Sequence, residues 1–148
     1  MGKFDITEIT KTTITTGLAG KIIGIYGTNN TGKSYVSARL FPGKTLWLAT
    51  EKGYNAQSDL YVYDIENWHD FRDAINQLTT RNKKKREKVR EMYDCVVVDT
   101  ADKIPSLCTQ YIISRYNEEQ SANFTDFNPI NEISAIPFGG GYASLNRE

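Results

Sequence analysis

The 148-residue sequence contains few of the residues that build metal centres or perform thiol chemistry. It holds one histidine, His69, and two cysteines, Cys95 and Cys108, which lack the spacing of metal ligands. These shortages argue against a zinc site and against a Cys–His nucleophile. We expect both cysteines to be reduced, half-buried thiols.

Excess charge and long apolar runs are also lacking. Lys plus Arg equals Asp plus Glu at 18 each, so any contact with nucleic acid or an acidic membrane must come from a local patch. No apolar run approaches the ~18 residues that cross a bilayer, and the N-terminus, MGKFDITEIT, lacks the apolar core of a secretion signal. We therefore expect a soluble, cytoplasmic protein without a membrane partner, with residues 1–148 forming a single domain.

What the sequence does have is an alternation of apolar strand-like segments with helical ones. The composition and spacing predict strands at 12–16, 21–26, 44–49, 60–65 and 95–99, and helices at 33–40, 68–78 and from 104 onward. Asn67, with Asp70 three residues later, is typical of a helix N-cap. Such an alternation favours an α/β fold with a mostly parallel sheet.

The stretch GTNNTGKSY has the phosphate-loop pattern G-x-x-x-x-G-K-[ST] between a predicted strand and a predicted helix. Two glycines allow the backbone to turn successive N–H groups inward and form an anion nest. The lysine would reach the β and γ phosphates of a nucleotide, and the serine hydroxyl would bind Mg²⁺. The predicted cofactors are ATP and Mg²⁺, and the predicted binding residues are Gly27, Thr28, Asn29, Asn30, Thr31, Gly32, Lys33, Ser34 and Tyr35.

Two acidic residues at strand ends complete the predicted site. Asp99 ends the apolar strand CVVVD, where its carboxylate can share the metal with Ser34. Glu51 follows the strand TLWLA at the edge where open α/β sheets bind ligands, and it is the candidate general base for hydrolysis. The predicted catalytic residues are therefore Glu51 and Lys33, with Asp99 or Asp102 as the next candidates for the base.

The order of these motifs resembles the RecA-like P-loop ATPase core, and most closely the phage-type RecA-like proteins of single-strand annealing and recombination. The resemblance rests on GTNNTGKS, the glutamate in LATEKG, the helix ENWHDFRDAINQL leading into YDCVVVDT, and the turn GGGYASL. It implies a three-layer fold, a water-activating role for Glu51, and homo-oligomers on DNA. A RecA-like core continues into a strand that bears a γ-phosphate sensor, so the sequence also resembles the N-terminal part of a longer core.

Two segments are candidates for contact with single-stranded DNA. Arg81–Arg90, RNKKKREKVR, carries seven basic residues and one acid, although such a run is more often a solvated helix face. Ser121–Gly141 contains three phenylalanines for base stacking but no Lys or Arg. It occupies the position of the first DNA-binding loop in the RecA-like family, yet its aromatic residues could equally pack internally.

We interpret the sequence as an ATP-binding, ATP-hydrolysing protein of phage-type DNA recombination or annealing. A small-molecule kinase is the first alternative, because phosphate loops also serve kinases and Arg81, Arg86 or Arg90 could act as lid arginines. A nucleotide-dependent interaction module that does not hydrolyse ATP is the second.

Overall fold

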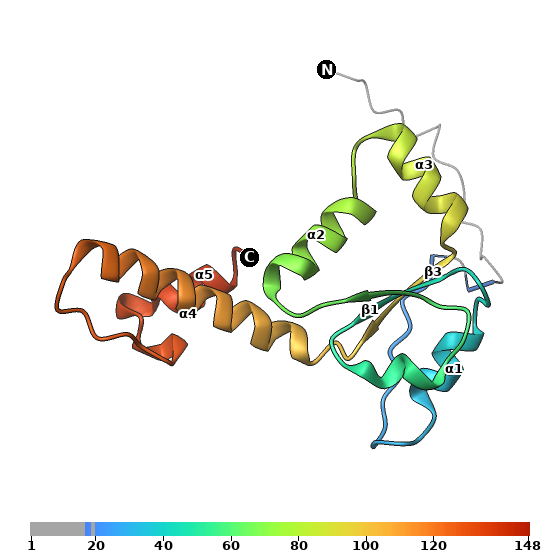
Figure 1. The fold of residues 1–148 in the computed structure, drawn as a ribbon, viewed down its shortest axis with the longest axis horizontal. Helices are drawn as coiled ribbons and strands as arrows, with labels where there is room; N and C mark the ends of the chain where they lie inside the picture. Colours follow the sequence, from blue (N-terminus) through green and yellow to red (C-terminus); the bar gives the residue numbers. More distant parts are fainter. Residues whose placement is uncertain (1–16, 19) are drawn as a thin grey trace, which may run out of the picture.

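Three parallel strands form the centre of the protein in the computed structural model, which describes residues 17, 18 and 20–148 (Figure 1). The central strand β1 (Thr45–Ala49) lies between β2 (Tyr61–Asp64) and β3 (Cys95–Asp99). Both pairings are parallel, as the sequence predicted. The carboxyl ends of all three strands therefore lie at one edge of the sheet.

Strand β1 is covered on both faces, because its side chains alternate between two apolar clusters. On one face Trp47 is fully buried and packs with Ala38 of α1 (Lys33–Arg39). On the other face Leu48 is fully buried and packs with Ala74 of α2 (Trp68–Leu78). The fold is thus the expected α/β arrangement with helices on both sides of the sheet.

Helix α2 has the bounds and the cap that the sequence predicted. The Asn67 side chain accepts a hydrogen bond from the Asp70 amide at 3.1 Å. The Asp70 carboxylate accepts in return from the amides of Glu66 at 2.9 Å and Asn67 at 3.1 Å. This reciprocal capping box satisfies donors that the first turn would otherwise leave unpaired.

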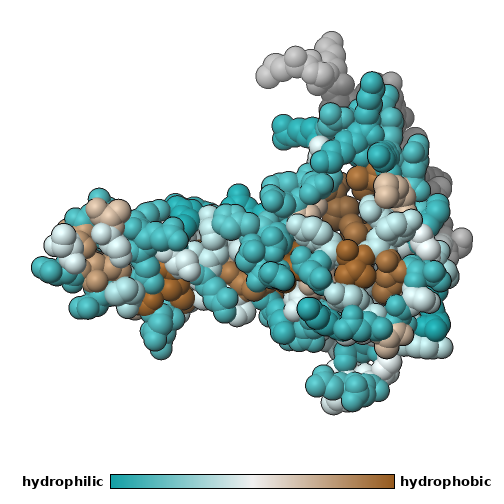
Figure 2. All heavy atoms as spheres, in the orientation of Figure 1, coloured by the Kyte–Doolittle hydropathy of each residue, from teal (hydrophilic) through white to brown (hydrophobic). Residues whose placement is uncertain are grey.

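Helix α3 (Lys83–Met92) contains most of the basic run, and none of its residues is buried. It leads directly into β3, so it lies at the amino edge of the sheet (Figure 1). Figure 2 shows apolar surface in the hollow between α2 and α3. Ile75 of α2, Met92 of α3 and Val96 of β3 are among the exposed apolar residues.

Helix α4 (Lys103–Asn123) starts at the carboxyl edge and projects away from the sheet (Figure 1). The chain then folds back along it through two short 3-10 helices, η3 (Ile133–Ala135) and η4 (Pro137–Gly139), into α5 (Gly140–Leu145). The segment that the sequence predicted as a long connection therefore begins with the last turn of α4 and contains both 3-10 helices.

A second apolar core joins this projecting part to α2. Trp68, Cys108, Ile112 and Ile136 are buried together. Glu148, which follows α5, also contacts α2. Its carboxylate accepts hydrogen bonds from Arg72 at 2.9 Å and from Trp68 Nε1 at 3.3 Å. The last helix is therefore held against α2 and α4 by both apolar and polar contacts.

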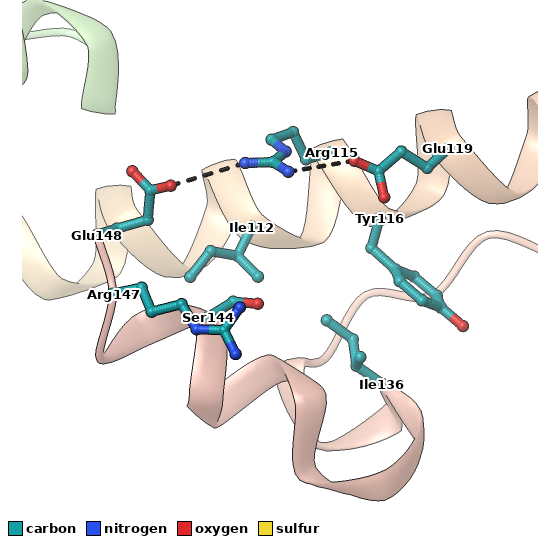
Figure 3. A pocket seen from close by; sticks show the side chains of 8 residues that line it. All are labelled: Ile112, Arg115, Tyr116, Glu119, Ile136, Ser144, Arg147 and Glu148. Atoms are coloured by element: carbon teal, nitrogen blue, oxygen red, sulfur yellow. Dashed lines mark hydrogen bonds and ion pairs between the residues drawn. The ribbon is translucent and has the colours of Figure 1, made fainter.

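A cavity of about 160 Å³ lies between α4 and α5. Figure 3 shows Arg115 reaching across its rim between two carboxylates, with ion pairs of 3.2 Å to Glu119 and 3.6 Å to Glu148. A larger cavity of about 440 Å³ lies between α2 and α4. Neither cavity is lined by a residue of the phosphate loop.

The strand predicted at residues 21–26 is not formed, and that prediction is wrong. The segment has no regular secondary structure, and Ile22, Ile23, Ile25 and Tyr26 are exposed. An apolar run becomes a strand only where a neighbouring strand pairs with its backbone, and the described sheet pairs only β2, β1 and β3. The strand predicted at 12–16 lies outside the described residues.

The two cysteines are free thiols, with Cys95 half-buried and Cys108 buried. Burial raises the pKa of both thiols, which keeps them protonated at neutral pH. Among the helices that the structure describes, none has the length and apolar character needed to span a membrane.

Candidate nucleotide-binding site

The phosphate loop bends sharply at its two motif glycines. Gly27 has φ +156° and Gly32 has φ +82°, and Asn30 between them has φ +63°. A Cβ atom on Gly27 would approach Thr31 Oγ1 to 2.9 Å, so a larger residue would displace that side chain. The glycines therefore allow a turn that most other residues would strain.

Loop amides provide donors for an anion. Among the described residues, no acceptor pairs with the backbone N–H groups of Thr28, Asn29, Asn30 and Gly32, and all four residues are exposed. Residues 29 and 30 form a turn within the loop. A run of amides in a turn of this kind forms a concave site for phosphate oxygens.

Lys33 folds over the same loop. Its Nζ donates to the carbonyl oxygens of Gly27 at 2.9 Å and Thr28 at 2.7 Å. The ammonium group is thus held at the mouth of the loop, close to the free amides. Tyr35 has a different environment, because its exposed ring stacks under the Arg39 guanidinium at 3.5 Å.

Ser34 and Asp99 meet at the carboxyl edge of the sheet. Ser34, in the first turn of α1, donates its hydroxyl to Asp99 Oδ2 at 2.9 Å. This contact joins the phosphate loop to the end of β3. The shared metal site predicted for these two residues stays a prediction. Both side chains are partly buried.

The geometry of this pair fits Mg²⁺, which prefers oxygen ligands in an octahedral arrangement. Neighbouring ligands of such an ion lie about 3.0 Å apart when each metal–oxygen bond is about 2.1 Å. The Ser34 and Asp99 oxygens, 2.9 Å apart, are close to that separation. One carboxylate beside a hydroxyl also leaves room for the phosphate and water ligands that Mg²⁺ usually keeps.

A pair of threonines fastens the ends of β1 and β3. Thr50 Oγ1 donates to the Thr100 carbonyl at 3.0 Å and accepts from the Thr100 amide at 2.8 Å. The sequence reasoning missed this clamp, although both strands are followed directly by threonine in LAT and VDT. Because the two ends are fixed to each other, the residues that follow them have defined relative positions.

Glu51 follows Thr50 and forms an ion pair with Lys103, the first residue of α4. The distance from Lys103 Nζ to Glu51 Oε1 is 2.8 Å. Gly53, two residues beyond Glu51, lies over Asp99, since a Cβ there would be 3.8 Å from Asp99 Oδ2. The sequence analysis did not single out Lys103. Its only indication there is that a basic residue follows the strand-end residue Asp99 by four positions.

Asp102, a further candidate base, has a carboxyl group whose pKa is lowered, first by the nearby Thr100 hydroxyl. A lower pKa makes a carboxylate a weaker proton acceptor, which counts against Asp102 as the base.

The other candidate residues lie elsewhere. Arg86 and Arg90 belong to α3 at the amino edge of the sheet, whereas the phosphate loop meets the carboxyl edge. In the connection after α4, Phe124 and Phe138 are exposed, whereas Phe127 packs against Tyr116 with ring centroids 6.0 Å apart. The three phenylalanines thus do not form one stacking surface.

Comparisons with known proteins agree with a nucleotide-binding site. The family model described as "AAA domain" matches residues 19–148. The SPbeta prophage-derived uncharacterized protein YorG of Bacillus subtilis (strain 168) is 39% identical over 110 residues, which are 74% of this chain and 32% of that protein. The chain therefore spans about a third of the length of this curated relative. No solved structure matches the chain significantly.

Proposed function

The chain belongs to the AAA domain family, whose members are P-loop ATPase-like, and from that premise we propose that it binds and hydrolyses ATP with Mg²⁺ in phage-type DNA recombination or single-strand annealing. The main support for ATP·Mg²⁺ binding is the hydrogen bond from Ser34 to Asp99. It brings the end of the phosphate loop to the acidic end of strand β3, as ATP·Mg²⁺ binding requires.

Each part of the site has a task in binding. The free amides of the loop donate to the phosphate oxygens, and Lys33 exchanges its carbonyl partners for the β and γ phosphates. Ser34 and Asp99 would hold Mg²⁺, whose charge would stabilise the negatively charged phosphates.

Glu51 is the proposed base for hydrolysis. It stands at the same edge as Asp99 and is about half exposed, so a water molecule can reach its carboxylate. By accepting a proton from that water, Glu51 would convert it into a stronger nucleophile. This role corresponds to that of the strand-end glutamate in a RecA-like core.

Helix α3 supports the DNA part of the proposal. Its first turn consists of Lys83, Lys84 and Lys85 with no acid, and the positive end of a helix dipole repels such charges. A nucleic-acid backbone placed there would relieve this repulsion. We propose that α3 contacts single-stranded DNA, that the aromatic connection contributes once subunits assemble on ATP, and that the protein acts as a homo-oligomer.

The kinase alternative is less well supported. Its lid arginines would have to reach the phosphates from α3, which lies at the opposite edge of the sheet. The cavities beside α4 are not lined by the phosphate loop, so neither offers an acceptor site next to it. If ATP binds without turnover, the chain instead acts as a nucleotide-dependent interaction module.

Substitution of the loop lysine tests the binding proposal. Lys33→Ala should abolish ATP binding and leave the fold intact, because the hydrogen bonds of the Lys33 ammonium to described residues are with carbonyl oxygens of its own loop. Titration calorimetry with Mg²⁺ measures the affinity, and circular dichroism checks the fold. Lys52→Ala is the matched control, because Lys52 is an exposed lysine outside the loop. Equal ATP affinity of Lys33→Ala and wild type would exclude the loop as the site.

A further inference from the structure

The ion pair between Lys103 and Glu51 differs from an ordinary surface ion pair in its short separation and in how its two segments are held together. Its 2.8 Å separation is the shortest among the ion pairs of the described residues. It joins the segment after β1 to the first residue of α4, and the Thr50–Thr100 clamp fixes these two segments to each other. The pair is therefore positioned by the backbone.

This anchored pair can nevertheless open easily. The side chains of Lys103 and Glu51 are 50% and 45% exposed, and ion pairs exposed to this extent add little to stability. Lys103 also has a flexible four-carbon stem and three donors, so it can turn from one anion to another without moving α4. An anchored but weak pair is suited to an exchange of partners.

Glu51 cannot serve as an efficient base while Lys103 holds it. A general base needs a carboxylate oxygen that is free to accept the proton of water, and here Oε1 accepts from the ammonium. The terminal phosphate of a nucleoside triphosphate carries more negative charge than a single carboxylate, and it would compete for the same ammonium.

We propose that Lys103 exchanges between Glu51 and the terminal phosphate of a bound nucleoside triphosphate. On the phosphate, Lys103 senses the γ position, and its departure frees Glu51 to activate water. A nucleoside diphosphate lacks that group and leaves Lys103 on Glu51. The inference deepens the proposed function and rests on it, because it requires that the nucleotide bind at the phosphate loop.

The first test compares a β,γ-imido ATP analogue with ADP by titration calorimetry in the presence of Mg²⁺. Lys103→Ala should weaken binding of the analogue about tenfold, as expected for one charge-assisted hydrogen bond, and leave ADP affinity unchanged. Lys103→Arg should retain most of the preference for the analogue. Lys52→Ala, which removes the exposed lysine next to Glu51, should change neither affinity.

The second test is a double-mutant cycle on the same binding measurement. Glu51→Gln removes the competing carboxylate charge, so analogue affinity should rise severalfold, and this gain should vanish when Lys103→Ala is also present. Independent effects of the two substitutions, or an unchanged ratio of analogue to ADP affinity in Lys103→Ala, would overturn the exchange while leaving the binding site in place. If the wild type binds neither nucleotide, the proposed function and the exchange fail together.

Discussion

At the scale of single residues, the charged and hydroxyl side chains of the site are already paired within the chain. Lys33 contacts two loop carbonyls, Ser34 contacts Asp99, and Glu51 contacts Lys103. Each pair contains one group that a phosphate, a metal or a water molecule would engage. Ligand binding is thus an exchange of hydrogen bonds, so the net affinity depends on how much better the ligand satisfies each donor.

Glu51→Gln should keep nucleotide binding and lose hydrolysis. The amide still hydrogen-bonds to water but cannot take its proton, and removal of such a base costs about 10²- to 10⁴-fold in rate. Phosphate release at saturating ATP measures the effect, and Glu118→Gln, on the exposed face of α4, is the matched control. Turnover at the wild-type rate in Glu51→Gln would exclude Glu51 as the general base and leave Asp102 or Asp99 as the candidates.

The sequence could predict the contact between Ser34 and Asp99, but it could not predict Lys103. Helix α1, which follows the phosphate loop, packs against β1, and β1 pairs with β3, so the first turn of α1 lies near the strand-end aspartate. The pair of Lys103 with Glu51 depends instead on how the register of β1 and β3 aligns Thr50 with Thr100. That register is a tertiary property, and no local pattern encodes it.

At the scale of elements, local signals succeeded where an element is stabilised by its own residues. Helix α2 has a complete capping box and apolar residues at helical spacing, and it has the predicted bounds. The segment 21–26 has an apolar pattern, but none of the described strands pairs with it, and it is irregular. A strand forms only where another strand pairs with it. An apolar run therefore predicts a strand less reliably than a helix cap predicts a helix.

Asn67→Ala tests the contribution of the cap to stability. The substitution removes the acceptor for the Asp70 amide and should cost about 1 kcal/mol. For a protein of this size the melting temperature should fall by about 2–4 °C. The control Asn76→Ala, on the exposed side of the same helix, should leave stability unchanged or slightly raise it, because alanine favours helix. Equal melting temperatures for the two variants would show that the cap contributes nothing measurable.

At the scale of the whole molecule, the candidate nucleotide site and the basic helix occupy opposite edges of one sheet. The phosphate loop meets the carboxyl end of β3, and α3 precedes its amino end (Figure 1). The described strands β1 and β3 lie between these two edges. We therefore expect the proposed DNA contact at α3 and the proposed ATP binding to be separable by substitution.

This separation makes the DNA proposal testable on its own. Changing Lys83, Lys84, Lys85 and Arg86 together to Ala should weaken binding of a labelled single strand, and α3 should persist because alanine favours helix. Anisotropy across a salt series measures the loss, and the slope of log affinity against log salt should fall by about 0.7 for each phosphate contact removed. Exchanging Lys and Arg at the same four positions conserves the charge and should retain the affinity. Equal slopes for the alanine variant and the wild type would exclude α3 as the contact, and no binding by either protein at low salt with ATP would exclude the DNA role.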